Sequence, residues 1–147
     1  MLNHKVLLTT VLLASSSIVS AAEHTVKLIT ANADGQMMMM DPGYLKIEKG
    51  DTVNFVPADA THNAVSFSIP SGAESFATPM GKPTTVVFGQ DGVYIYKCVP
   101  HSALGMVGVI QVGKAVNFEQ AKKEGAAFNA SVVMNKTRIT EYLNQVK

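Results

Sequence analysis

The sequence predicts an all-β fold, an antiparallel sandwich or barrel, with two short helices packed on it near the C-terminal end. Seven short segments alternate apolar and polar residues, and turn signals such as Asp34-Gly35 and Asp91-Gly92 separate most of them. After Gly113 the composition changes to helix-forming residues. Many short strands at this spacing are typical of sandwiches and barrels.

The predicted strands lie at 25–30, 44–47, 52–56, 64–67, 84–88, 92–97 and 107–112. Because alternate residues of a strand share one face of the sheet, three apolar pairs should point into the core. These pairs are Val53 with Phe55, Val86 with Phe88, and Val93 with Ile95. The segment 69–83 contains three prolines and little alternation, so we expect a loop there.

Two segments near the C-terminus have the composition of helices. They read "NFEQAKKEGAAF" and "NKTRITEYLNQV", and each begins with an asparagine that could cap a helix, Asn117 and Asn135. Four apolar residues of the second segment share one face at helical spacing. They are Ile139, Tyr142, Leu143 and Val146. Both helices should therefore pack on the sandwich.

The first 22 residues have the pattern of a cleaved secretory signal. Lys5 precedes an apolar run over 6–13, and the small residues Ser20, Ala21 and Ala22 end the segment. The run is too short to span a membrane, which takes about 20 apolar residues. We therefore expect a signal peptide over 1–22, and a single exported domain over 23–147 that is soluble, periplasmic and has no membrane anchor.

The charge balance argues against nucleic acid as a partner. The chain has 12 Lys and Arg against 11 Asp and Glu, so removal of Lys5 with the signal leaves the two signs equal. Binding of nucleic acid depends largely on a positive field. The chain also has one cysteine, Cys98, so no disulfide can form within it. In an oxidising compartment, where paired cysteines are expected, a single thiol needs another explanation.

The stretch "KCVPHSALGM" places Cys98, His101 and Met106 on one loop between two predicted strands. A thiolate, an imidazole and a thioether suit copper, and two histidines, one cysteine and a distant axial methionine make the blue-copper donor set. The second histidine should be His62, in "ATHNAVSF", because His24 lies near the expected mature terminus. Each residue could separately be buried core, but the four together indicate a metal site.

These residues resemble the cupredoxin family, and within it the pseudoazurins. The resemblance covers nearly all of 23–147, through "IEKGDTVNFVP", "THN", "GVYIYKCVPH", "GMVGVIQVG" and the two trailing helices. It implies a Greek-key β-sandwich that holds one type 1 copper through His62, Cys98, His101 and axial Met106.

The resemblance also implies supporting roles for two residues near the ligands. Asn63 would fasten the two ligand loops together, and its backbone N–H would donate to the Cys98 sulfur. Tyr94 would be a corner tyrosine with a structural role. The run Met37 to Met40 is best read as core filling, and Met38 is a candidate neighbour of the copper site.

The function implied is one-electron transport rather than catalysis. Transient partners would be cytochrome c or a copper nitrite reductase, bound by the monomer through an apolar patch around His101 formed by residues 102–105. Three lysines, Lys82, Lys97 and Lys114, are candidates for a ring around that patch.

Two other classes of function remain open at this stage. A copper chaperone or storage protein would use the methionine run to hold Cu(I) and would lack strong colour. An enzyme with Cys98 as nucleophile would need His101 or His62 as base and an oxyanion site, and it leaves Met106 unexplained.

Overall fold

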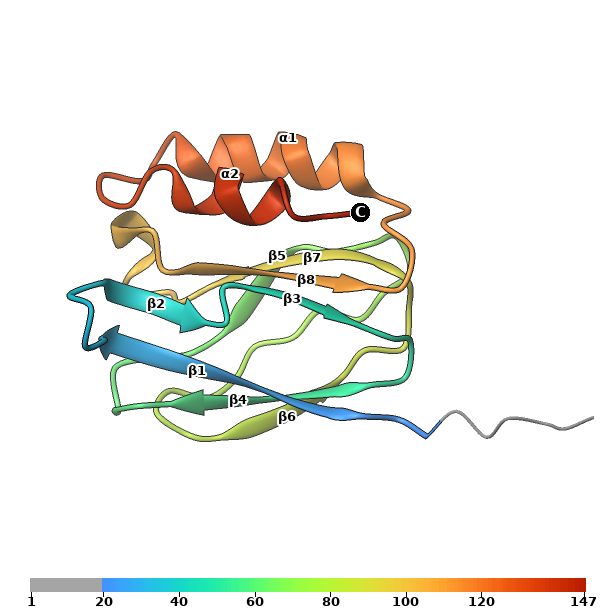
Figure 1. Cartoon of the computed structure of the whole chain (residues 1–147), viewed down its shortest axis with the longest axis horizontal. Coiled ribbons are helices and arrows are strands. Elements are labelled where there is room, and N and C mark those ends of the chain that lie inside the picture. Colours follow the sequence, from blue (N-terminus) through green and yellow to red (C-terminus); the bar gives the residue numbers. More distant parts are fainter. Residues whose placement is uncertain (1–19) are drawn as a thin grey trace, which may run out of the picture.

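The computed structural model describes residues 20–147, which form two facing four-stranded sheets with two helices on the outer side of one of them (Figure 1). The first sheet has the order β2 (Met37–Asp41), β1 (Glu23–Ala31), β4 (Thr52–Pro57) and β6 (Thr84–Val87). The second has the order β3 (Tyr44–Ile47), β8 (Val107–Val112), β7 (Gly92–Lys97) and β5 (Val65–Ser68). The helical elements are η1 (Ser102–Leu104), α1 (Phe118–Asn129) and α2 (Arg138–Leu143).

All seven strands expected from alternation form, with ends that shift by a residue or two, and the predicted β-sandwich is confirmed. The alternation pattern did not predict β2, because the four consecutive methionines from Met37 to Met40 show no period of two. Pairing with β1, from Ala31 opposite Met37 to Lys27 opposite Asp41, holds this segment as a strand.

Strand direction differs from the expectation of purely antiparallel sheets. The pairs β1 with β4 and β3 with β8 are parallel, and the other four pairs between named strands are antiparallel. Parallel neighbours need a crossover connection, and here the chain crosses through the opposite sheet between β1 and β4. An alternating pattern reports which face is buried and carries no information on strand direction, so this feature could not be predicted.

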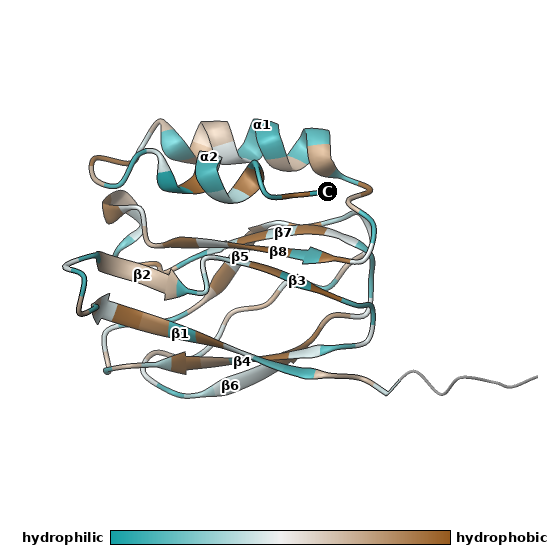
Figure 2. Cartoon of the chain, viewed as in Figure 1, coloured by the Kyte–Doolittle hydropathy of each residue, from teal (hydrophilic) through white to brown (hydrophobic). Residues whose placement is uncertain are grey.

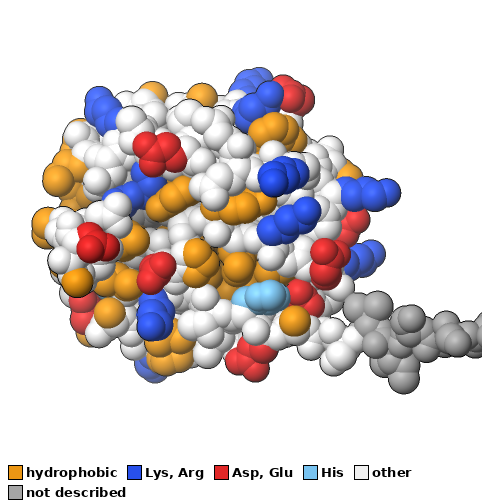
Figure 3. Space-filling model, in the orientation of Figure 1, with side chains coloured by type: hydrophobic (Ala, Val, Ile, Leu, Met, Phe, Trp, Pro, Cys, Tyr) orange, Lys and Arg blue, Asp and Glu red, His pale blue; other side chains and the backbone are white. Residues whose placement is uncertain are grey.

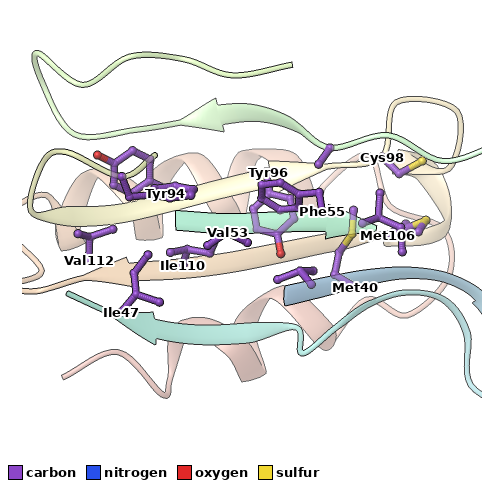
Figure 4. Packing of buried hydrophobic residues seen from close by; sticks show 14 residues of the cluster. Met40, Ile47, Val53, Phe55, Tyr94, Tyr96, Cys98, Met106, Ile110 and Val112 are labelled. Atoms are coloured by element: carbon purple, nitrogen blue, oxygen red, sulfur yellow. The ribbon is translucent and has the colours of Figure 1, made fainter. Parts of the chain in front are cut away.

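The main core lies between the sheets, where Val53 and Phe55 are fully buried and Phe88 is almost so, while Val86 packs at its margin. Figure 4 shows Phe55 and Tyr96 close together in this layer. The pair Val93 and Ile95 is also buried, but on the other face of the sheet, beneath the helices. The prediction that this pair is buried in the core is confirmed, but the core it enters is the second one, because β7 is buried on both faces.

The two helices lie over β7 and β8, whose ribbons are largely coloured hydrophobic in Figure 2. Apolar side chains of α2 pack in one cluster with those of the two strands. Ile139 and Leu143 are buried, and Tyr142 and Val146 pack at the margin of the same cluster, as helical spacing predicts. Gly125 lets the helices approach, because a Cβ there would lie 2.9 Å from Leu143 Cδ1 and 3.2 Å from Ile139 Cδ1.

Both predicted asparagine caps need correction. Asn117 stands at the N-cap of α1, but its side chain makes no cap hydrogen bond and instead pairs with the backbone of Val93. Asn135 is not the N-cap of α2, which is Thr137. The Asn135 amide donates to the Leu104 carbonyl in the loop before β8, so a tertiary contact replaces the local one.

The predicted signal segment falls mostly outside the described residues, which begin at Ser20 and enter β1 at Glu23. Within residues 20–147, no helix has the length and apolar character needed to cross a membrane.

Candidate metal centre

The four predicted ligands come together at one end of the sandwich. His62 lies in the loop that follows β4, Cys98 directly follows β7, and Met106 directly precedes β8. His101 lies in the loop between Cys98 and Met106, just before η1. In Figure 4 the sulfur atoms of Cys98 and Met106 lie at the same end of the core. His62, Cys98 and Met106 are fully buried, and His101 is half-buried.

Three of the side chains converge on one point. The Nδ1 atoms of His62 and His101 lie 3.8 Å and 3.5 Å from the Cys98 sulfur. The two imidazole rings are 5.0 Å apart between centroids. One donor atom from each of these residues falls within 4.8 Å of the others, so a single ion can contact all three. Met106 packs in the same buried cluster as Cys98.

The outer nitrogen of His62 is fastened by a network that the sequence analysis did not anticipate. Thr30 Oγ1 lies 2.8 Å from His62 Nε2 and donates its proton to Asp59 Oδ2 at 2.6 Å. A hydroxyl has one proton to give, so Oγ1 must accept a hydrogen bond from Nε2–H. That proton on Nε2 leaves the lone pair of Nδ1 directed at the Cys98 sulfur, as a metal ligand requires.

The protonation of His62 and Asp59 favours this arrangement. Burial is the main cause that lowers the pKa of His62; Asp59 opposes this change and His101 adds to it. A neutral imidazole is the form that binds a metal. The pKa of Asp59 is held well below its usual value by hydrogen bonds from Thr30 and Thr61, so the carboxylate stays charged beside His62.

The Cys98 thiol is buried and its pKa is raised. Burial is the largest cause, and the backbone N–H groups of Asn63 and His101 lower the pKa in opposition by hydrogen bonding to the sulfur. This direction agrees with the predicted donation from the Asn63 N–H to the Cys98 sulfur, which stays a prediction. A raised pKa keeps the thiol protonated in the metal-free protein, and a bound metal would displace that proton.

The ligand loops are joined by short hydrogen bonds. The Asn63 side-chain oxygen accepts from the Val99 N–H at 2.9 Å, which ties the His62 loop to the cysteine loop as predicted. The Cys98 N–H donates to the Met106 carbonyl at 3.0 Å, and this bond closes the loop at its base. The predicted corner tyrosine is also confirmed, because Tyr94 Oη donates to the Gln90 carbonyl at 2.9 Å.

The four methionines from Met37 to Met40 differ in burial. Met40 is buried between the sheets, Met38 and Met39 are half-buried, and Met37 is 48% exposed. Met38 packs against the main core cluster, which includes Cys98 and Met106 among its members, and its direct contact with the site stays a prediction. The run serves mainly as a strand with one core-filling side chain.

The lysine ring expected around the patch needs correction. Lys114 follows the far end of β8, at the opposite end of the sandwich from η1, so it cannot border His101 (Figure 1). The Lys97 ammonium lies over the rings of Phe67 and Phe128, 5.6 Å and 5.9 Å from their centroids. Lys82 remains near the site, since the preceding residue, Gly81, donates to the His62 carbonyl.

The donor set fits copper. Two imidazole nitrogens, one thiol sulfur and one buried thioether are the ligands of type 1 sites, whereas hard cations take oxygen donors. The buried site also excludes water from three of the four side chains.

Comparison with known proteins gives the family. Residues 26–113 match the model of the copper-binding proteins of the plastocyanin/azurin family. The chain belongs to this family. It is similar to the pseudoazurin of Paracoccus pantotrophus, 39% identical over 105 residues that cover 69% of this chain and 72% of that one. It is likewise similar to the pseudoazurin of Methylorubrum extorquens, 38% identical over 70% of this chain and 71% of that one.

The fold agrees with solved structures of the same family. The crystal structure of native pseudoazurin from Hyphomicrobium denitrificans superposes with a TM-score of 0.76 at 35% identity, over 85% of this chain and 98% of that one. The predicted cupredoxin fold and the predicted cofactor, one copper ion, are thereby confirmed. The pseudoazurin relatives imply a small copper electron carrier.

Proposed function

We propose that the protein is a periplasmic one-electron carrier whose single type 1 copper is bound by His62 Nδ1, Cys98 Sγ, His101 Nδ1 and the Met106 thioether. The observation that carries this proposal is the convergence of the three donor atoms within 4.8 Å of one another beside buried Met106. When bound, the copper ion would supply the Cu(II)/Cu(I) couple, and the protein residues would hold its ligands in place.

The buried site suits electron transfer because its ligands are held before the metal arrives. Thr30 orients His62, Asn63 ties the loops together, and the Cys98 N–H closes the ligand loop on Met106. Rigid ligands limit the rearrangement that accompanies a change of oxidation state. Four protein donors also leave no coordination position for a substrate.

Partner binding would use the apolar surface at the metal end of the sandwich. Exposed apolar side chains gather on the segments that contact the ligand loops, and in Figure 3 orange side chains are prominent at the left, the end where Figure 1 places β2 and η1. The large exposed ones on these segments are Met37, Met80, Val99, Val133 and Met134. His101 is the one proposed ligand that is not fully buried, so we propose that an electron passes to a docked partner through its ring.

A c-type cytochrome or a copper nitrite reductase is the partner class we propose, bound as a brief encounter complex by the monomer. Such redox contacts are small, and an apolar patch with few charges would release a partner quickly. Of the three lysines expected around the patch, Lys82 is the one that could steer an acidic partner, because Lys114 lies at the far end and Lys97 is held over aromatic rings.

An enzymatic role for Cys98 is less well supported. Reactive cysteines are partly exposed and have a lowered pKa, whereas Cys98 is fully buried and its pKa is raised. The nitrogen of His101 and that of His62 both approach the same sulfur, which suits shared coordination of a metal better than a nucleophile with one base.

We propose that a signal peptide over residues 1–22 is removed on export. The remaining domain over 23–147 contains all four proposed ligands. Glu23 begins β1, so the proposed cleavage after Ala22 falls at the edge of the folded domain. N-terminal sequencing of the protein recovered from the periplasmic fraction would test both the location and the cleavage point.

The proposal is tested by adding Cu(II) to the metal-free protein and recording the visible spectrum, then reducing it with ascorbate. We expect an intense band from the copper–thiolate bond that disappears on reduction and returns on oxidation. Copper that binds without such a band, and that a chelator removes readily, would favour the chaperone or storage function instead.

Cys98→Ser provides the matched variant for this experiment. The substitution removes the thiolate but changes the side-chain volume little, so we expect a folded sandwich by circular dichroism with no intense visible band. An intense band in the folded variant would contradict the assignment of Cys98 as a ligand.

A further inference from the structure

Arg138 is a buried cation in an unusual setting. It lies near the start of α2, is 8% exposed, and forms no salt bridge with any carboxylate in residues 20–147. Arginine is rarely buried unless its charge is paired or fully hydrogen-bonded. The guanidinium here is balanced by backbone carbonyls only, and these come from two distant parts of the chain.

The three carbonyls lie on the two segments that flank the metal centre. Arg138 Nη1 donates to the carbonyl of Gly105 at 2.9 Å and to that of Met38, and Nη2 donates to that of Met37 at 3.1 Å. Gly105 directly precedes Met106, and Met37 and Met38 begin β2. One side chain therefore joins the end of the ligand loop to the neighbouring sheet.

The backbone of β2 is adapted to this contact. The β1–β2 ladder pairs Ile29 with Met39 and Ala31 with Met37 but skips Met38 between them. Met38 has φ of +50°, a left-handed conformation that non-glycine residues adopt at a cost. The carbonyl of Met38 is thus withdrawn from the sheet and accepts the bond from Arg138.

Three contacts follow one another along the loop between Cys98 and Met106, and Arg138 makes the last of them. The Val133 N–H donates to the Ala103 carbonyl, and the Asn135 side chain donates to the Leu104 carbonyl, each at 2.8 Å. The Gly105 carbonyl follows, bound by Arg138. The segment 133–138 thereby satisfies every carbonyl from 103 to 105, immediately before the proposed axial ligand.

We propose that Arg138 is a positioning residue for Met106: its guanidinium clamps the Gly105 carbonyl to β2 and thereby sets where the thioether lies relative to Cys98. This inference rests on the proposed function, which makes Met106 a ligand. It assigns the C-terminal helical segment a role at the metal centre in addition to covering the sheet. A role limited to anchoring α2 would affect stability and leave the metal site unchanged.

The test compares Arg138→Met and Arg138→Lys with Lys136→Met. Arg138→Met removes both charge and hydrogen bonds, whereas Arg138→Lys keeps the charge but lacks the planar fork that reaches three carbonyls. Lys136 is exposed on the same segment, so Lys136→Met removes one positive charge without disturbing the loop. If Arg138→Met fails to fold, the comparison is made between Arg138→Lys and Lys136→Met.

The first readout is the visible and electron paramagnetic resonance spectrum of each copper-loaded protein. We expect both Arg138 variants to change the relative intensities of the visible bands, which report the geometry around the thiolate, and Lys136→Met to match the wild type. The second readout needs no metal. In the metal-free proteins, amide exchange at Gly105 and Met106 should be at least tenfold faster in both Arg138 variants.

Wild-type spectra and wild-type exchange at Gly105 and Met106 in the folded Arg138 variants would overturn the inference, even if their stability were lower. A change in Arg138→Met that is absent from Arg138→Lys would assign the effect to charge and would also overturn the clamp. Failure of the proposed function is distinguishable, because the wild-type protein itself would then lack the intense band.

Discussion

The imidazole of His62 illustrates how a ligand is prepared at the residue scale. The Thr30 hydroxyl accepts a hydrogen bond from His62 Nε2–H and donates one to Asp59. Thr61 donates to the same carboxylate through its N–H and its hydroxyl. The chain of bonds has one direction, because each hydroxyl has a single proton to donate. The tautomer of His62 is thus decided by two residues outside the metal centre.

Thr30→Val tests this role. The substitution preserves the branched shape but removes the hydroxyl, so the outer nitrogen of His62 loses its 2.8 Å partner and retains only the longer 3.4 Å contact with Asp59 Oδ2. Loss of such an outer contact typically lowers metal affinity about 10–100-fold, and we expect a decrease in that range for copper, measured by competition with a chelator.

Thr85→Val is the control, because Thr85 is an exposed threonine of β6, an edge strand of the same sheet that β4 separates from β1. It makes the same change of hydroxyl to methyl far from His62. Equal copper affinities in the two variants and the wild type would show that the Thr30 hydroxyl does not orient the ligand.

At the scale of elements, Asn117 fastens α1 to β7. Its side chain accepts from the Val93 N–H at 2.7 Å and donates to the Val93 carbonyl at 2.9 Å, so one amide satisfies both backbone groups of a fully buried residue. This explains why the residue at the helix start makes no cap bond of its own. The sheet contact has replaced the local one.

Asn117→Ala should therefore be markedly destabilising. It leaves the Val93 N–H and carbonyl without partners, and an unsatisfied buried group costs about 1–3 kcal/mol. We expect a decrease in the free energy of unfolding of about that size in urea titration. Asn144→Ala, at the exposed C-cap of α2, should change it little; equal effects of the two substitutions would refute the role of Asn117.

Asp51 links the entry to β1 with the turn before β4. In the chain that retains Ala22, hydrogen bonds from the Ala22 N–H, the His24 ring and the Glu48 N–H lower the pKa of Asp51 to about 2. Because the folded pKa lies below the unfolded value of about 3.9, this carboxylate stabilises the fold above about pH 4. That contribution is lost as the pH falls toward 2.

Asp51→Asn should remove this pH dependence. We expect the difference in free energy of unfolding between the chain 20–147 and its Asp51→Asn variant to be largest above pH 4 and to shrink toward pH 2. Urea titrations at several pH values measure it. Asp34→Asn, in the exposed β1–β2 turn, is the control and should show no such convergence. A constant difference across the range would contradict the assignment.

At the scale of the whole molecule, the metal centre joins segments from both sheets, so binding of copper should stabilise the entire fold. The ligands follow β4 of one sheet and β7 of the other. A ligand that binds only the folded state at 100 times its dissociation constant adds about 2.7 kcal/mol, which for a domain of this size raises Tm by roughly 10 °C.

Calorimetry of the copper-free and copper-loaded proteins measures this shift. We expect a higher Tm with copper, a return to the lower value after chelation, and a much smaller shift in Cys98→Ser. A Tm that copper leaves unchanged would mean that the metal does not bridge the two loops.

Local patterns were sufficient to predict most of the strands and the helical segments. Alternation placed Val53 and Phe55 in the core, and helical spacing placed Ile139 and Leu143 beneath α2. Both follow from which face an element buries, a property that neighbouring residues encode. The same logic failed for β2 and for the parallel pairs, because a methionine run has no period and strand direction leaves no local trace.

The four proposed ligands could be predicted from the sequence alone, because Cys98, His101 and Met106 are close along the chain and few histidines remained to complete the set. Only the tertiary structure decided how they are held. Thr30 reaches His62 across 32 positions and Arg138 reaches Gly105 across 33, each through hydrogen bonds that no local pattern reveals. Donor chemistry belongs to residue types, whereas the orientation of a donor depends on contacts that exist only once distant segments pack together.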